Sequence, residues 1–149
     1  KKFKAFDNKT IVFGAVEREG RVIAKVIPNT SPLTLVDAVN ENIEEGSFMV
    51  SDEQVGYKQL NKSYKHASVN HSKGQYVRGA AHTNTIEGFW NILKKQINGI
   101  HHSVSPKHLQ RYCNEAGYRY SNRLLEQDLR FTDALANCDG RLKYNDLIK

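Results

Sequence analysis

Long apolar runs are absent from this sequence of 149 residues. A membrane-spanning helix needs roughly 18 consecutive apolar residues, whereas the longest apolar run, residues 11–16, has only the length of a strand. No apolar signal-peptide segment opens the chain. We therefore expect a protein without a membrane partner.

Cysteine is scarce as well. Cys113 and Cys138 are the only two, and their spacing matches no common zinc or redox motif. The histidines at 101, 102 and 108 lack a paired Cys-x-x-Cys, which argues against a structural zinc site. We expect both thiols to be buried and reduced, as in a cytoplasmic protein.

Acidic residues are outnumbered by basic ones. Lys and Arg together number 22 and Asp and Glu 16, so the net charge is +6. Such an excess favours a polyanionic partner such as nucleic acid, although the same excess can serve solubility alone. The hydrophobic content of 39% and the charged content of 26% are ordinary. The length predicts one domain that covers residues 1–149.

Strand-like composition dominates the first part of the chain. Residues 10–18 and 21–28 are rich in β-branched side chains and are separated by Glu19-Gly20, which predicts an antiparallel hairpin. Two shorter strands are predicted at residues 47–51 and 64–69, with a brief helix at 54–60 between them. Residues 70–82 are polar, basic and rich in glycine, and they predict a loop.

Helical periodicity accounts for the other segments. Pro32 opens a pattern that runs to about residue 43, with Leu33, Val36 and Val39 on one face. The remaining predicted helices run from Thr83 or Asn84 to Asn98-Gly99, from Ser105-Pro106 to Leu124, and over about residues 128–137. A hairpin followed by alternating strands and helices predicts an α/β protein with helices packed on a mixed sheet.

Two of these helices have predicted apolar faces. The faces carry Ile86, Phe89, Trp90, Leu93 and Ile97 in the first helix, and Leu109, Tyr112, Cys113, Ala116, Tyr120 and Leu124 in the second. Trp90 and Tyr76 could stack on nucleic-acid bases. For Trp90 we favour the core, because it shares its face with Phe89 and Leu93.

Two carboxylates stand at positions that suit chemistry. Asp52 follows an apolar strand, where ligands gather in α/β proteins, although Asp is also a favoured helix N-cap. Glu87 lies near the start of a helix, and its spacing from Asn84 is also that of a capping box. Lys94 is two turns beyond Glu87 on the same face, either to bind a phosphate or as a solvated charge.

A site with two carboxylates suits Mg²⁺ or Mn²⁺, which prefer oxygen ligands. Two such ions about 3.5–4 Å apart can activate an attacking oxygen and stabilise the leaving oxygen of a phosphodiester. This chemistry needs no nucleophilic side chain. It therefore agrees with a sequence in which we find no persuasive Ser-His-Asp or Cys-His arrangement and no Gly-rich phosphate loop.

Three segments resemble one protein family. They are VNHSKGQY at 69–76, HTNTIEGFW at 82–90 and SPKHLQRY at 105–112. These segments are similar to the DDE-type transposases of bacterial insertion sequences, in the branch with the H-T-N-T-I-E-G-F-W motif. The resemblance covers roughly residues 10–125.

The resemblance implies a catalytic domain like those of ribonuclease H and retroviral integrase. Such a domain cleaves and joins double-stranded DNA with two metal ions, and a homodimer is compatible with it. By motif, Asp52 matches the second acidic ligand and Glu87 the third. Asn84 matches an Asn that some members use at the third position, and Lys94 matches the basic residue two turns further on.

The first Asp of the family has no clear match here. It would lie on a first strand upstream of the hairpin, where this sequence offers only Asp7. We therefore expect the first strand to be missing and the domain to be truncated at its N-terminus. Two alternatives follow: a catalytically inactive DNA-binding or assembly fragment of the same fold, or a ribonuclease H-like nuclease.

DNA binding by such a domain would use its basic side chains, because Lys and Arg contact phosphates. The candidates near the motif are Lys73, Arg78, Lys94, Lys95, His101, His102, Lys107 and Arg111.

Overall fold

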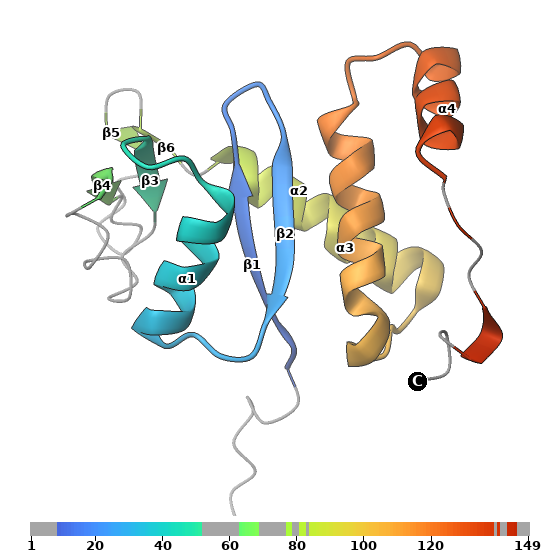
Figure 1. Cartoon of the computed structure of the whole chain (residues 1–149), viewed down its shortest axis with the longest axis horizontal. Helices are drawn as coiled ribbons and strands as arrows, with labels where there is room; N and C mark the ends of the chain where they lie inside the picture. Colours follow the sequence, from blue (N-terminus) through green and yellow to red (C-terminus); the bar gives the residue numbers. More distant parts are fainter. Residues whose placement is uncertain are drawn as a thin grey trace, which may run out of the picture.

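The computed structural model contains a hairpin sandwiched between helices (Figure 1). The structure describes residues 9–51, 63–68, 77–78, 81–82, 84–138, 140 and 143–145. Strands β1 (Ile11–Val16) and β2 (Val22–Ile27) pair antiparallel, with Ile11 opposite Ile27 and Val16 opposite Val22. The predicted hairpin is therefore confirmed.

Helix α1 (Pro32–Asn42) covers one face of the hairpin. Ser31 caps it, because its hydroxyl accepts a hydrogen bond from the Thr34 amide, and Pro32 occupies the first turn. The predicted apolar face was wrong in part: Leu35, Ala38 and Val39 are buried, whereas Leu33 is 71% exposed. Two neighbouring stripes of this helix are apolar, and the position of the hairpin decides which of them is buried.

Strands β3 (Phe48–Ser51) and β4 (Lys65–Ser68) form a parallel pair, close to the predicted bounds. Met49 and Tyr64 pack against the cluster formed around Phe13 and Val39, which ties this pair to the hairpin and α1. The helix predicted at 54–60 lies outside the described residues.

A third pair of strands lies in the segment predicted to be a loop. Strands β5 (Val77–Arg78) and β6 (Ala81–His82) pair antiparallel. Two-residue strands are too short to form an alternating pattern, so periodicity could not predict them. Among the described residues the strands pair two by two, one pair parallel and two antiparallel, and the single continuous sheet we expected is not seen there. The α/β class is confirmed.

Helix α2 (Asn84–Lys95) begins where predicted. A π-helix, η3 (Gln96–His101), follows it without a break, so the predicted end at Asn98-Gly99 is wrong. The chain turns at His102, whose φ is 60°, and the Ser103 amide donates to the His101 carbonyl at 2.6 Å. This three-residue γ-turn, and not a glycine cap, ends the helix.

Helix α3 (Pro106–Ser121) packs on the other face of the hairpin and closes the outer edge of β2. The side-chain amide of Gln110 accepts from the Val26 amide at 2.7 Å and donates to the Ala24 carbonyl at 2.9 Å. The Ser121 hydroxyl accepts from the Val22 amide at 3.1 Å. Side chains of α3 thus take the place of a neighbouring strand.

The C-terminal part packs less tightly. Helix α4 (Gln127–Ala136) has no buried residue, and Leu124, expected in the stripe of α3, lies beyond that helix and is 81% exposed. Cys113 is buried, whereas Cys138 is exposed, which corrects the expectation for the second thiol. Within the described part of the chain, none of the helices is long and apolar enough to span a membrane.

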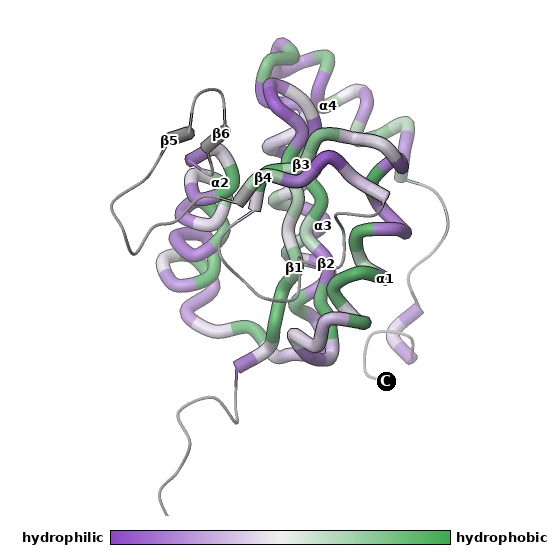
Figure 2. Tube along the Cα trace, turned by 90° about the vertical axis from the view of Figure 1, so that its left-hand side faces the viewer, coloured by the Kyte–Doolittle hydropathy of each residue, from purple (hydrophilic) through white to green (hydrophobic). Residues whose placement is uncertain are grey.

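The hairpin divides the core into two clusters. Phe13 and Ile27 pack with α1, whereas Val22 and Ala24 pack with Phe89 of α2 and with α3. The apolar residues concentrate on β1 and α1, and polar and apolar residues alternate along α2 and α4 (Figure 2). The apolar stripe predicted for α2 is confirmed.

Trp90 fixes how closely α2 approaches β1. Its ring lies against Gly14, at a place where a Cβ atom would overlap with the ring. Trp90 also contacts Phe89, with ring centroids 5.3 Å apart. The preference for Trp90 as a core residue is therefore confirmed.

Replacing Gly14 by alanine should lower the free energy of unfolding by about 1–3 kcal/mol, because the added methyl group overpacks this contact. Urea denaturation followed by far-UV circular dichroism measures the change. The double variant Gly14→Ala, Trp90→Phe should recover part of the loss, because the smaller ring leaves room for the methyl group. Equal midpoints for Gly14→Ala and the unmodified chain would contradict the packing seen here.

Candidate metal site and DNA interface

The start of α2 carries two of the predicted site residues. Because the helix begins at Asn84, Asn84 and Glu87 lie one turn apart on the same face, and both side chains are exposed. Three apolar side chains of α2, Phe89, Trp90 and Leu93, hold the opposite face against the hairpin and α3. Oxygen donors at this end of α2 are therefore directed away from the core.

A hollow of about 1140 Å³ connects this end of α2 with β3. Its described walls include all six residues of β1, residues 47–51 with β3, and Thr85, Ile86, Glu87 and Trp90 of α2. Ser51, the last residue of β3, precedes Asp52 in the sequence. The hollow therefore has both Glu87 and the residue before Asp52 in its walls. Asp52 itself lies outside the described residues, as does Asp7.

His66 of β4 supports the end of β3. Its Nε2 atom lies 2.7 Å from the Ser51 hydroxyl, which is a hydrogen bond between the paired strands. Burial lowers the pKa of His66 below its ordinary value of 6.5, because desolvation disfavours the charged imidazolium. Sequence reasoning did not single out His66. The signal would have been a histidine on the strand predicted to follow the one that ends at Asp52.

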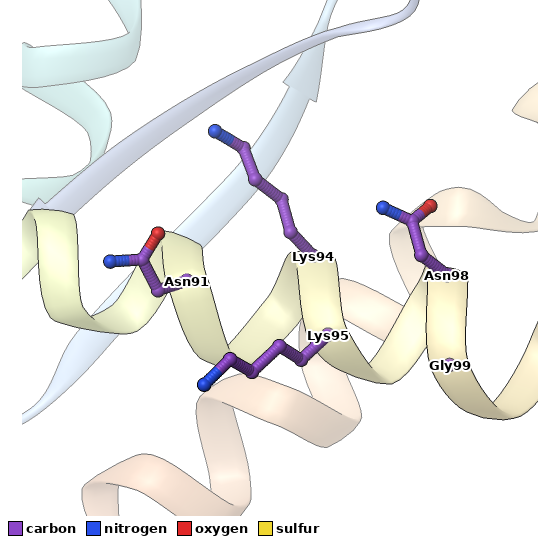
Figure 3. Close-up of a pocket in the computed structure, with 5 residues that line it drawn as sticks. All are labelled: Asn91, Lys94, Lys95, Asn98 and Gly99. Carbon is purple, nitrogen blue, oxygen red and sulfur yellow. The ribbon is translucent and has the colours of Figure 1, made fainter.

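Lys94 lies seven residues beyond Glu87, about 10 Å along the helix. It lines a shallow hollow of about 480 Å³ with Asn91, Lys95, Asn98 and Gly99. Figure 3 shows Asn91, Lys94 and Asn98 projecting from one side of the helix, and Lys95 projecting away from them. Asn91 and Asn98 were missed, although the steps of three and four residues from Glu87 could have found them.

The other predicted DNA-binding residues divide into three sets. His101, at the end of η3, packs edge-on against Tyr112, with ring centroids 4.7 Å apart, while His102 is exposed in the γ-turn. Lys107 and Arg111 are exposed on the first turns of α3. Lys73 and Tyr76 lie outside the described residues, and for Arg78 only the backbone, in β5, is described.

The described ranges contain no cluster of acidic and metal-binding side chains, at the start of α2 or elsewhere. Within them, no group of three His, Cys, Asp or Glu side chains is placed to hold a metal ion.

The comparison with known families identifies one of them from the sequence of the chain. The model of the ISXO2-like transposase domain matches residues 1–121, which is most of the chain, and the chain belongs to this transposase family of insertion sequences. No curated protein matches the chain. No solved structure matches it either.

Acidification should destabilise the fold through His66. Because burial lowers the pKa of His66, the unfolded chain takes up the proton first, and stability falls as the pH drops below about 6.5. His66→Asn keeps a hydrogen-bonding side chain near Ser51 but removes this titration. Between pH 8 and pH 5, the melting temperature of the unmodified chain should therefore fall relative to that of the variant. An equal change of melting temperature between pH 8 and pH 5 in both proteins would contradict the prediction.

Proposed function

We propose that the chain is the catalytic domain of a DNA transposase that cleaves and joins DNA strands by metal-dependent phosphoryl transfer. Asp52 and Glu87 are the proposed metal ligands, with Asn84 as the alternative or additional ligand on α2. One observation carries the proposal: Ser51, the neighbour of Asp52, and Glu87 line the same hollow. Membership of the transposase family supports it.

The donors at this site suit a hard divalent cation. Glu87 and Asn84 offer carboxylate and amide oxygens on an exposed helix face. Mg²⁺ and Mn²⁺ accept such oxygens and keep several waters. When bound, these ions would supply activation of the attacking oxygen and stabilisation of the leaving oxygen. The proposed ligands would hold the metal ions at the start of α2. Lys94 is proposed to bind a phosphate further along the DNA.

The hollow also offers room for the first acidic ligand. Among the described residues, β2 is the only strand that pairs with β1, and β4 the only one that pairs with β3. Both β1 and residues 47–51 line the hollow. A strand that carries the first Asp would fit between them and would join the two pairs into the mixed sheet expected for a ribonuclease H-like domain.

Mn²⁺ or Mg²⁺ should raise the melting temperature of the chain, because a ligand that binds only the folded state stabilises it. A concentration of 100 times the dissociation constant would add about 2.7 kcal/mol. Asp52→Ala and Glu87→Ala should abolish the increase. Differential scanning fluorimetry measures it, and Asp37→Ala, on the exposed side of α1, is the control that should keep it. An unchanged metal response in both site variants would exclude these ligands.

Reaction products separate the proposed function from its alternatives. Incubation of a transposon-end duplex with target DNA and Mn²⁺ should give joined products. Cleavage without joining would indicate a ribonuclease H-like nuclease. Salt-dependent DNA binding without cleavage would indicate an inactive binding or assembly module.

A further inference from the structure

Beyond Glu87, the exposed side of α2 and η3 carries several residues for which the family resemblance implies no role. They are Gly88, Asn91, Asn98 and Gly99, beside the two lysines 94 and 95. We propose that the sugar-phosphate backbone of one DNA strand lies along this side, from Glu87 to Gly99, in close contact with the helix backbone at the two glycines. This inference rests on the proposed function, since it takes DNA as the substrate.

The charge of this surface fits a polyanion. From Gly88 to His102 the sequence contains no Asp or Glu, while Lys94 and Lys95 are both exposed. Asn91 and Asn98 flank Lys94 in the shallow hollow and carry amide groups that can donate to phosphate oxygens. The side chains therefore offer both charge and hydrogen-bond donors along one line.

The glycines have no explanation within the fold. Glycine inside a helix is unfavourable relative to alanine, yet neither Gly88 nor Gly99 has a positive φ. Apart from chain neighbours and the backbone of the helix itself, no heavy atom of the described residues would lie within 4 Å of a Cβ atom at either position. Gly14 is the contrast, because the Trp90 ring requires it. Close approach of a ligand to the backbone is the remaining use of a glycine at such a place.

The spacing of the glycines suits a nucleic-acid strand. Eleven residues separate Gly88 from Gly99, which is about three helical turns and about 16 Å. Successive phosphates of one DNA strand advance about 3.4 Å along the duplex axis. The surface is therefore long enough to contact more than one phosphate of a strand.

The decisive variants are Gly99→Ala and Gly88→Ala in the 149-residue chain. Alanine should raise the melting temperature by about 2 °C, since it favours the helix. It should also weaken binding of a short duplex of random sequence by about tenfold, because the methyl group keeps the DNA backbone away. Fluorescence anisotropy in a salt series measures the affinity. A stability gain coupled to a loss of binding is the expected signature.

Side-chain variants test the rest of the surface. Asn91→Ala and Asn98→Ala should weaken binding equally for two duplexes of unrelated sequence, because phosphate contacts carry no sequence information. Lys95→Ala should lower the slope of log affinity against log salt by about 0.9. Lys143→Ala makes the same charge change elsewhere, and Thr132→Ala changes an exposed position of α4. Both controls should bind like the unmodified chain.

The outcomes distinguish this inference from the proposed function. Unchanged affinity in both glycine variants would overturn the inference, and so would a lowered melting temperature, which would show that folding needs the glycines. Gly99→Ala should keep the stabilisation by Mn²⁺. If the unmodified chain shows no such stabilisation but the glycine variants still lose DNA affinity, the metal site fails and the DNA surface stands.

Discussion

The contact between α2 and the β1–β2 hairpin determines where the proposed site residues of α2 lie. Phe89 is fully buried, and Trp90 rests on Gly14, so α2 can approach β1 only at this depth and rotation. Burial of one face orients the opposite face outward. Glu87 consequently lines the hollow beside β1, and Lys94 follows it two turns along. A single apolar stripe thus sets the position of both the proposed ligand Glu87 and the surface proposed to bind DNA.

Much of this fold could be predicted from periodicity. The alternation in the hairpin and the stripe of α2 each specify one buried face, and both predictions are confirmed. The buried face of α1 could not be predicted fully, because Leu33 and Leu35 are equally apolar and only the hairpin decides between them. The predicted end of this helical segment near Gly99 was also wrong, since η3 continues to a γ-turn at His102, and a positive φ is uncommon for a residue other than glycine.

The candidate site, like the fold, could be predicted from the sequence only in part. Asn84, Glu87 and Lys94 lie on one helix, where spacing alone predicts a shared face, and their roles stay predictions from the family resemblance. His66 contacts Ser51 across two paired strands, and no local spacing predicts a parallel register. Helical spacing also places Asn91 and Asn98 on the side of Glu87 and Lys94, and the shallow hollow shows that they lie beside Lys94. Asp52 remains a prediction from its place after β3.

Gln110 and Ser121 make the two edges of the hairpin different. They occupy the amides and a carbonyl on the outer edge of β2, so this side cannot accept another strand without first displacing α3. An edge blocked by side chains is also protected from pairing with other molecules. In the described part of the chain, β1 has no strand on its other side. An added strand could therefore extend the hairpin only at β1, on the side of the hollow that Glu87 also lines.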